Sequence, residues 1–339
     1  MGCAVIFGGS GFIGVFFARH LLETNQYEKI YLYDIEKVSD KAFPYRRKLV
    51  EEYKDQIVQI VGDVRTAITW KPEESVDLIA NFAAVHREPG HEDYEYYQTN
   101  LQGADNVCAW ATLVACPEIV FTSSISPYGP SEEEKTEASL PVPVTAYGGS
   151  KLVAEKIHLA WQAESTARHL TIIRPGVVFG PGEGGNVSRL IKAVTHKYFF
   201  YMGNRSTRKA GTYVKELCHA ISWVRNLQRQ EKKSHALFNM SMNPGPSIED
   251  YVQMVCEVGG FTRTIPNVPY PVLLALSYAI DAIAKPLGIK HPFSPVRIRK
   301  LVRSNNILPR FLVHNEYPYK YSLKTAFEDW KKSCPEEWK

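Results

Sequence analysis

The stretch "GGSGFIG", residues 8–14, decides the fold class of this chain. It overlaps the end of an apolar run at residues 3–9, which predicts a buried strand, and it leads into residues 12–24, where apolar side chains recur at helical spacing. Gly8, Gly11 and Gly14 have no side chains, so the backbone can approach a pyrophosphate at the helix N-terminus, where amides and the helix dipole favour negative charge. A tight turn without a ligand would show the same glycines, so the motif needs a second signal.

Asp34 supplies that signal, because it follows Gly14 by twenty residues and ends the second predicted strand, residues 30–34. A carboxylate in this place hydrogen-bonds the adenosine ribose of a dinucleotide. It would also repel a 2′-phosphate, so the sequence predicts NAD rather than NADP. Asp63 ends the third predicted strand and is expected to accept from the adenine amine; a helix N-cap is the alternative interpretation.

The first half of the chain alternates predicted strands with predicted helices, which indicates right-handed βαβ units. The expected strands are residues 3–9, 30–34, 56–63, 76–84, 118–124 and 170–176. The expected helices are residues 12–24, a stretch after residue 63, residues 93–115 and residues 146–166. The fold class is therefore α/β, a Rossmann doubly wound parallel sheet with a smaller C-terminal substrate-binding domain.

The alternation of predicted strands and helices becomes weaker after Arg174. Residues 176–186 are expected to form a glycine-rich loop, and the charged run at 131–137 a solvated loop. We expect residues 1–180 to form the NAD-binding domain, to which the chain returns at about 206–240. Residues 181–205 and 241–339 are expected to form the substrate-binding domain.

Composition narrows the class of protein. The 339 residues carry a net charge of +4 with a pI of about 8.6, which suits an anionic small substrate and gives no support for nucleic-acid binding. The six cysteines form no C-x-x-C pair, so we expect reduced thiols, a cytoplasmic protein and no metal site. The apolar stretch at residues 270–288 contains Asp281 and prolines, which argues against a stable membrane span. A core or interfacial helix is the favoured interpretation, and contact with a membrane surface is the alternative.

Tyr147 and Lys151 lie four residues apart on a predicted helix, and therefore on one face. A phenol with a pKa of about 10 is a poor base at neutral pH, but a nearby ammonium and the positive nicotinamide ring favour the phenolate. Such a tyrosine takes the proton of an alcohol while hydride leaves the same carbon. The spacing also occurs by chance on surface helices; here it follows a nucleotide cradle and a serine-rich strand end, which favours catalysis.

Together these motifs resemble the extended short-chain dehydrogenase/reductase family, and within it the NAD-dependent epimerase/dehydratase group that acts on sugar nucleotides. The resemblance rests on residues 8–14, 62–64, 81–84, 99–103, 122–129, 147–151 and 174–182, and on Asp34. It implies that Ser124 hydrogen-bonds the reacting oxygen, that Tyr147 is the acid/base, and that Lys151 lowers the pKa of Tyr147 and holds the nicotinamide ribose. The implied NAD-binding residues are Gly8, Gly11, Phe12, Ile13, Gly14, Asp34, Asp63, Val64, Ala83, Ala84, Asn100, Tyr147 and Lys151.

The substrate side rests on the same resemblance, and it implies a nucleotide-sugar substrate and a homodimer. Ser124 and Tyr147 are expected to contact the sugar. The other implied substrate contacts, for each of which ordinary surface placement is the alternative, are His86, Asn186, Arg208, Lys209 and Arg303.

Two departures shape the expected chemistry. Sugar-nucleotide dehydratases of the family carry an Asp-Glu pair where this chain has Ile125 and Ser126. The chain therefore lacks the two carboxyl groups that transfer protons during elimination in those relatives. The residues at 174–177 are Arg-Pro-Gly-Val rather than the R-x-F-N of many epimerases, a form shared with 3β-hydroxysteroid dehydrogenase-like relatives. We therefore predict a UDP-hexose or UDP-N-acetylhexosamine 4-epimerase that passes through a 4-keto sugar. A 4-keto-sugar reductase or hydroxysteroid-type dehydrogenase is the alternative, and a non-catalytic NAD-binding regulator is the third reading.

Overall fold

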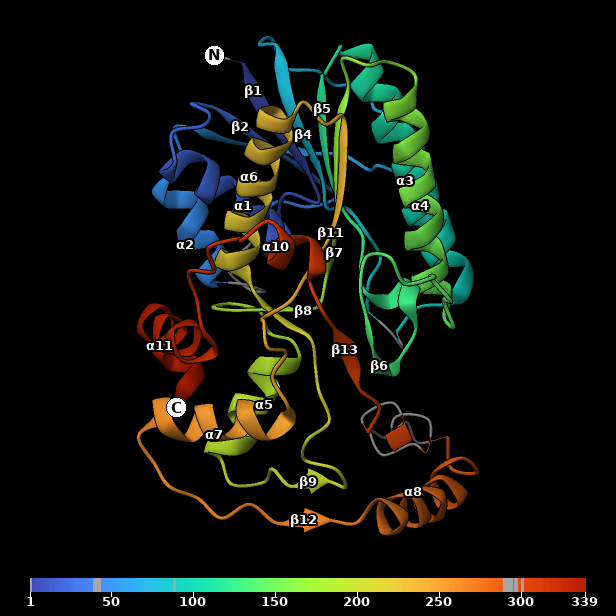
Figure 1. The fold of residues 1–339 in the computed structure, drawn as a ribbon, viewed down its shortest axis with the longest axis vertical. Helices are drawn as coiled ribbons and strands as arrows, with labels where there is room; N and C mark the ends of the chain where they lie inside the picture. Colours follow the sequence, from blue (N-terminus) through green and yellow to red (C-terminus); the bar gives the residue numbers. More distant parts are fainter. Residues whose placement is uncertain (1, 39–43, 88–89, 289–294, 296–297, 300–301) are drawn as a thin grey trace.

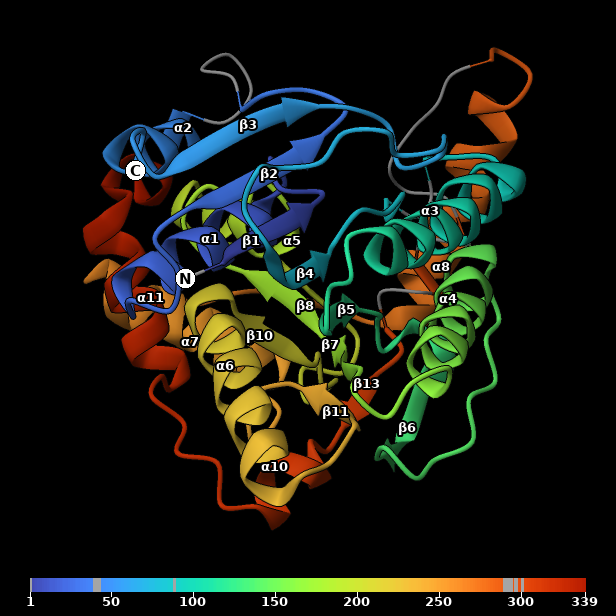
Figure 2. The same cartoon turned by 90° about the horizontal axis from the view of Figure 1, so that it is seen from above.

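Seven parallel strands form the central sheet, in the order β11-β7-β5-β4-β1-β2-β3 (Figures 1 and 2). The computed structural model describes residues 2–38, 44–87, 90–288, 295, 298–299 and 302–339. The seven strands are β1 (Cys3–Phe7), β2 (Ile30–Asp34), β3 (Ile57–Val61), β4 (Val76–Asn81), β5 (Glu118–Thr122), β7 (His169–Pro175) and β11 (His235–Met240). Because helices cover both faces, the inner strands are apolar almost throughout, and β1 and β5 are buried at every position.

Helices pack on both faces of this sheet, which gives the expected Rossmann arrangement of three layers (Figure 2). One face carries α1 (Phe12–Glu23), α2 (Pro44–Glu52) and α6 (Val214–Glu231), and the other carries α3 (Asp93–Leu113) and α4 (Ala146–Ala163). Two separate apolar clusters result, one on each side of the sheet. The doubly wound parallel sheet predicted from the sequence is confirmed.

All but one of the remaining elements lie beyond the carboxyl ends of the strands, in the lower half of Figure 1; the exception is α10 (Arg310–His314), which packs against β11. The others are the helices α5 (Asn186–Thr195), α7 (Ile248–Gly259), α8 (Tyr270–Ala284) and α11 (Leu323–Ser333), and the short strand pairs β8 (Val177–Phe179) with β10 (Gly211–Tyr213), β9 (Tyr201–Met202) with β12 (Asn267–Val268), and β6 (Ser131–Lys135) with β13 (Asn305–Ile307). A third apolar cluster, centred on Phe179, Phe327 and Trp330, joins α5, α7 and α11. The sheet edge that carries the predicted site therefore faces a second packed unit.

Several local predictions were wrong. Residues 62–75 form turns and extended chain rather than a helix, and α2 instead follows β2. The expected loop at 176–186 contains β8, and the expected loop at 131–137 contains β6, although Glu132, Glu133 and Glu134 are exposed as predicted. In each case the strand is paired with residues more than thirty positions away, and such pairing leaves no local signal.

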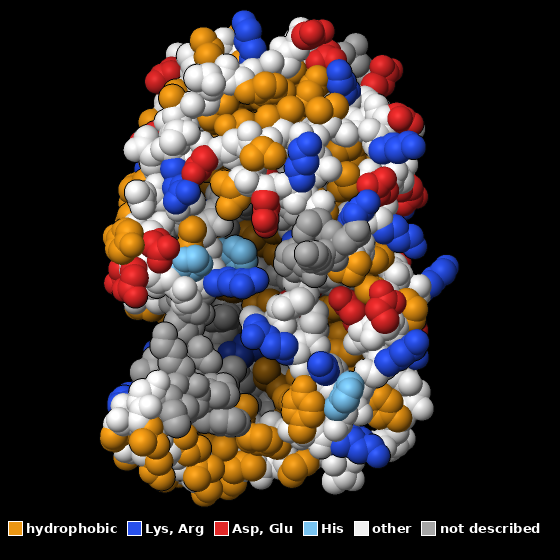
Figure 3. All heavy atoms as spheres, turned by 180° about the vertical axis from the view of Figure 1, so that it is seen from behind, with side chains coloured by type: hydrophobic (Ala, Val, Ile, Leu, Met, Phe, Trp, Pro, Cys, Tyr) orange, Lys and Arg blue, Asp and Glu red, His pale blue; other side chains and the backbone are white. Residues whose placement is uncertain are grey.

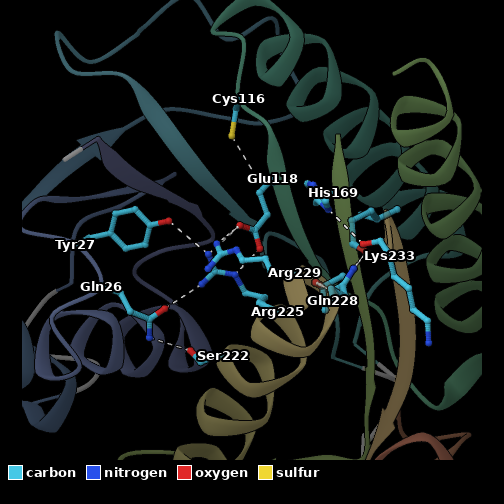
Figure 4. A network of polar contacts seen from close by, with 12 residues as sticks. Gln26, Tyr27, Cys116, Glu118, His169, Ser222, Arg225, Gln228, Arg229 and Lys233 are labelled. Carbon is cyan, nitrogen blue, oxygen red and sulfur yellow. Dashed lines mark hydrogen bonds and ion pairs between the residues drawn. The ribbon is translucent and has the colours of Figure 1, made fainter. Parts of the chain in front are cut away.

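A buried ionic network fastens α6 to the sheet at the amino ends of the strands (Figure 4). Glu118 begins β5, and Arg225 of α6 donates to its carboxylate from Nε at 2.5 Å and from Nη2 at 3.0 Å. Arg229, one turn later on α6, donates to the same carboxylate at 2.7 Å. Burial by itself would raise the pKa of Glu118, but the two guanidinium groups outweigh it and hold the pKa below its usual value.

All six cysteines are free, as the sequence predicted. Within the described part of the chain, no helix combines the length and the apolar character needed to cross a membrane.

Candidate active site

The glycine motif lies at the junction of β1 and α1, and its geometry requires glycine. Gly8 has φ +72°, and a Cβ on it would lie 2.6 Å from the backbone N of Ala83. A Cβ on Gly14 would lie 2.6 Å from the carbonyl oxygen of Gly8. Phe12 and Ile13 form the first turn of α1, so the N-terminus of this helix opens directly onto the loop. A turn of this geometry at a helix N-terminus can accommodate a pyrophosphate, and binding of NAD by this loop stays a prediction.

Asp34 lies beside this loop at the end of β2. Its Oδ2 accepts a hydrogen bond from the Ser10 amide at 3.0 Å, and its Oδ1 accepts from the Ile35 amide at 2.8 Å. Burial raises the pKa of this carboxyl, while the backbone donors oppose the rise. The carboxylate is thus held at the edge of the cradle, where the ribose of a dinucleotide would meet it.

Asp63 and Val64 follow β3. The Asp63 carboxylate forms a bidentate pair with Arg65, at 2.9 Å to Nε and 2.6 Å to Nη2, and this hydrogen bonding lowers the pKa of Asp63. No helix begins here, so the N-cap interpretation was wrong. Val64 is buried against Gly103 of α3, where a Cβ would lie 2.9 Å from the valine Cγ2.

Asn100 of α3 ties the loop after β4, which contains Ala83 and Ala84, to helix α4. Its Oδ1 accepts from the Val85 amide at 3.0 Å, and its Nδ2 donates to Ser150 Oγ at 2.9 Å. Ser150 in turn donates to the carbonyl of Tyr147 at 2.9 Å. Asn100 therefore fixes the distance between the expected cofactor-lining loop and the helix that carries Tyr147.

Tyr147 and Lys151 lie on the first turns of α4, which begins where the Thr145 side chain accepts from the Gly148 amide at 3.1 Å. Tyr147 is half-buried, whereas Lys151 is 2% exposed, with its ammonium 4.5 Å from the ring centre of Phe121 on β5. Burial lowers the pKa of Lys151 to about 7, and the charge of Glu155 opposes this. Lys151 is therefore a buried amine that titrates near neutral pH, which is uncommon outside functional sites.

Ser124 lies in the segment just after β5, against the start of α4. Its Oγ accepts from the Ser126 amide at 3.1 Å and donates to Ser126 Oγ at 3.2 Å. A Cβ on Gly148 would lie 2.8 Å from the carbonyl oxygen of Ser126, so the serine segment and the helix are in contact. The structure thus brings Ser124 to the helix turn that bears Tyr147.

Two buried residues beneath this segment were missed by the sequence analysis. Glu155 of α4 accepts from Ser123 Oγ at 2.5 Å and from Arg174 of β7, at 2.8 Å from Nε and 2.6 Å from Nη2. Arg174 also donates to the hydroxyl of Tyr128 at 2.7 Å. The signal for Glu155 was available, because it follows Lys151 by four residues and so extends the face of α4 that carries Tyr147 and Lys151.

Arg46 of α2 is a third missed residue. It is 7% exposed, its guanidinium lies 5.5 Å from the ring centre of Phe12, and its Nη2 donates to the Gly182 carbonyl at 3.2 Å. Burial lowers its pKa to about 10, and the nearby charge of Arg87 adds to this. A cation therefore lies beside the first turn of α1, and no sequence pattern at α2 indicated it.

The predicted substrate contacts fall into separate places. Lys209 donates to the main-chain carbonyl of Arg303 at 2.5 Å, and Arg208 donates to the Gly245 carbonyl, so these basic residues share one edge of the molecule. Burial lowers the pKa of Lys209 to about 8. Asn186 begins α5 and accepts from Arg189 at 2.9 Å.

His86 follows the expected cofactor-lining loop and is exposed. Partial desolvation of its ring lowers its pKa, and the charges of Arg87 and Lys151 add to this.

Comparison with known proteins gives a consistent picture. The model of the NAD dependent epimerase/dehydratase family matches residues 4–240. An N-acetyl-alpha-D-glucosaminyl-diphospho-ditrans,octacis-undecaprenol 4-epimerase of Escherichia coli O157:H7 is 29% identical over 87% of this chain and 84% of its own length. A 3beta-hydroxysteroid-dehydrogenase/decarboxylase of Arabidopsis thaliana is 26% identical over 88% of this chain and 71% of its own. The fold is similar to that of UDP-glucuronic acid 4-epimerase from Bacillus cereus in complex with NAD, with a TM-score of 0.74, 17% identity and coverage of 99% and 100%.

Proposed function

The chain belongs to the NAD-dependent epimerase/dehydratase family, and we propose that it is a 4-epimerase that inverts one carbinol of a hexose held through a diphosphate. Ser124, Tyr147 and the buried Lys151 are the observation that carries this proposal. They combine a hydroxyl donor, a phenol and an ammonium in one small region between β5 and α4.

The residues around the cradle fit NAD. Gly8, Gly11 and the first turn of α1 would hold the pyrophosphate, and Asp34 would bind the adenosine ribose. Val64, Ala83 and Ala84 would line the cofactor, and Asp63 would meet the adenine, which requires it to share its carboxylate with Arg65. Bound NAD would take a hydride from the sugar carbon and return it to the opposite face.

The remaining steps belong to the chain itself. Tyr147, as phenolate, takes the hydroxyl proton of the carbinol and later returns it to the ketone oxygen. Lys151 stabilises the phenolate by its charge, and Ser124 hydrogen-bonds the reacting oxygen. Ile125 and Ser126 offer no carboxylate for removing a proton from a neighbouring carbon, which supports inversion at one centre over elimination.

Substrate binding is assigned to residues 181–205 and 241–339, together with His86 and the basic edge at Arg208 and Lys209. Asn186 and Arg303 complete the proposed contacts.

Dimerisation through α3 and α4 is proposed as well, because Tyr94 and Leu113 of α3 and Val153 of α4 are exposed apolar residues on that layer. Light scattering of the purified protein tests the dimer.

A Tyr147→Phe variant tests the catalytic assignment. We expect turnover to fall about 10²- to 10⁴-fold while the variant still folds and still binds NAD, because only the proton-transferring hydroxyl is lost. Tyr198→Phe, which removes an exposed phenol, is the matched control. Turnover close to that of the unmodified protein in Tyr147→Phe would contradict the assignment.

The second candidate is a net dehydrogenase of the hydroxysteroid type, favoured by the Arg174–Val177 sequence and by the plant relative. A sugar deuterated at C4 separates the two functions. Epimerisation returns the deuteride to the same carbon and leaves no reduced cofactor in solution. Stoichiometric accumulation of reduced cofactor, carrying the deuterium lost from the sugar or formed together with an oxidised sterol alcohol, would establish the dehydrogenase instead.

A further inference from the structure

Helix α8 carries an exposed apolar face. Its buried side is formed by Leu273, Ser277 and Ala284. The side chains on the opposite arc, at helical spacings of three and four residues and at the turn that follows the helix, are all apolar and exposed: Val272, Ala275, Leu276, Ala279, Ala282, Ile283, Pro286 and Leu287. We call this set the apolar face of α8; its largest members, Val272, Leu276, Ile283 and Leu287, are 55%, 55%, 68% and 65% exposed.

This exposure is unusual for a surface helix, which normally presents polar residues to water. Figure 3 shows hydrophobic side chains gathered along the lower edge of the molecule, the edge where α8 lies in Figure 1. An exposed apolar surface of this kind marks a site of interaction rather than ordinary solvent contact.

Basic groups flank the apolar face. Lys285 directly follows α8; its side chain is 78% exposed and pairs with the mostly buried Asp281 at 2.7 Å. Arg299 donates to the hydroxyl of Tyr278, which is itself 50% exposed at the border of the face. Apolar residues bordered by a tyrosine and by lysine and arginine are the pattern of a helix that lies in the interface of an anionic bilayer.

The same edge leads to the expected substrate side. Arg299 precedes Arg303 by four residues, and the Arg303 carbonyl accepts from Lys209. Arg208 lies beside Lys209 and is exposed. Arg303, one of the proposed substrate contacts, therefore follows α8 along the chain, and its hydrogen bond with Lys209 joins it to the other basic residues of the proposed substrate side.

We propose that the apolar face of α8 docks on the surface of an anionic lipid bilayer, so that the diphosphate-linked hexose is taken from a lipid carrier at headgroup depth. This inference rests on the proposed function, and it specifies that the diphosphate of the substrate is attached to a membrane lipid instead of to uridine. The charge around the face decides between occupants, because basic groups complement anionic headgroups, whereas a second copy would bring the same positive charges together. The Escherichia coli relative, named for a sugar diphosphate on a polyprenol, agrees with this carrier.

Flotation with vesicles tests the docking. The full chain is mixed with vesicles of phosphatidylglycerol and phosphatidylcholine in equal parts, and with vesicles of phosphatidylcholine alone. We expect binding to the anionic vesicles that weakens as salt is raised. A double variant, Leu276→Glu with Ile283→Glu, should bind at least about tenfold more weakly, because it removes apolar area from the interface and adds like charge to it.

The matched control places the same charges on equally exposed apolar residues elsewhere. Leu140 and Val144, 80% and 66% exposed, lie in the connection between β6 and α4. The variant Leu140→Glu with Val144→Glu should float like the unmodified protein, and both double variants should keep its melting temperature and NAD affinity. Failure of the unmodified protein to float, or equal flotation of all three proteins, would overturn the proposal. Conversion of a larger oligomer to a smaller one by the α8 variant, without vesicle binding by the unmodified protein, would assign the face to a second copy and overturn it as well.

A second pair of assays keeps this inference separate from the proposed function. One uses soluble UDP-N-acetylglucosamine, and the other uses N-acetylglucosaminyl diphosphate on a polyprenol in anionic vesicles. Turnover of the vesicle substrate should fall in the α8 variant and recover when the same substrate is presented in detergent micelles. Flotation without epimerisation of either sugar would refute the proposed function alone. Epimerisation of the vesicle substrate at equal rates by the α8 variant and the unmodified protein would refute the docking alone.

Discussion

Two buried arginine–carboxylate pairs hold the two ends of β5, and they differ in what they support. At the amino end, Glu118 binds Arg225 and Arg229 and fastens α6 to the sheet. At the carboxyl end, Glu155 binds Arg174 and Ser123 beneath the segment that contains Ser124. The chemistry is the same, but only Glu155 lies one turn from Lys151, where its charge opposes the lowering of the Lys151 pKa by burial.

The difference shows that the chemistry of a buried ion pair does not decide whether it affects catalysis; its distance from the catalytic residues does. Such pairs contribute little net stability compared with apolar packing, but breaking one leaves an uncompensated charge in the interior. Both pairs should therefore be costly to break. Only the pair at the carboxyl edge should alter proton transfer when it is broken.

The largest effect is expected for Glu155→Gln. Arg174, 4% exposed, then loses its charged partner, and we expect unfolding free energy to fall by about 3–5 kcal/mol. Losing the carboxylate also lowers the pKa of Lys151 further, so the basic limb of the turnover–pH profile should move to lower pH. Urea unfolding and a pH series of turnover measure the two effects. Glu118→Gln is the matched control: it should lower the stability and leave the turnover–pH profile unchanged. Identical shifts of the profile in both variants would show that the two ion pairs do not differ in their effect on proton transfer.

Arg225→Met should follow, with a loss of about 2–4 kcal/mol, because Glu118 keeps Arg229 as a partner while losing its bidentate one. Differential scanning calorimetry gives the stability, and an NAD titration gives the cofactor affinity. The affinity should not change, since α6 meets this network at the amino ends of the strands (Figure 4). A weaker NAD affinity in the folded variant would show that the two ends are coupled.

Lys151→Met sharpens the comparison through pH. The unfolded chain holds a proton on Lys151 up to about pH 10, whereas burial lowers the pKa in the folded state to about 7. Between these values the unfolded state binds more protons, so this group makes the folded state gain stability as pH rises. Urea unfolding at pH 7 and pH 9 should show a gain in the unmodified protein that exceeds the gain in Lys151→Met by on the order of 1–3 kcal/mol. Equal gains would show that Lys151 keeps its proton in the folded state.

The smallest effect is expected for Arg229→Ala. The Arg229 side chain is 53% exposed, so water screens its pair with Glu118, and Arg225 still neutralises the carboxylate. We expect a loss below about 1 kcal/mol. Thermal unfolding of Arg229→Ala and of Arg225→Met checks this. Similar losses of stability in the two variants would mean that the exposure of an arginine does not determine how much its ion pair with Glu118 contributes.

The parts of the candidate site whose local placement follows from the sequence share a local origin. Gly8, Gly14 and Asp34 belong to one βαβ unit, and the spacing of Tyr147 and Lys151 is set by one helix. The parts that were missed depend on contacts between distant segments. Arg174 meets Glu155 across β7 and α4, and Arg46 reaches the Gly182 carbonyl from α2. The pairing of β6 with β13 joins segments about 170 residues apart, and neither sequence contains a local pattern that indicates the other strand.

The doubly wound sheet, the glycine turn at residues 8–14 and the shared face of Tyr147 and Lys151 follow from local sequence patterns, because backbone sterics and helical periodicity act over a few residues. Long-range packing, in contrast, buries Lys151 beside Phe121 and lowers its pKa to about 7, and it pairs Glu155 with Arg174 beneath the serine segment. It also decided which side of the apolar stretch at 270–288 faces water. Burial and electrostatic environment depend on which distant segments pack together, and that depends on the whole chain.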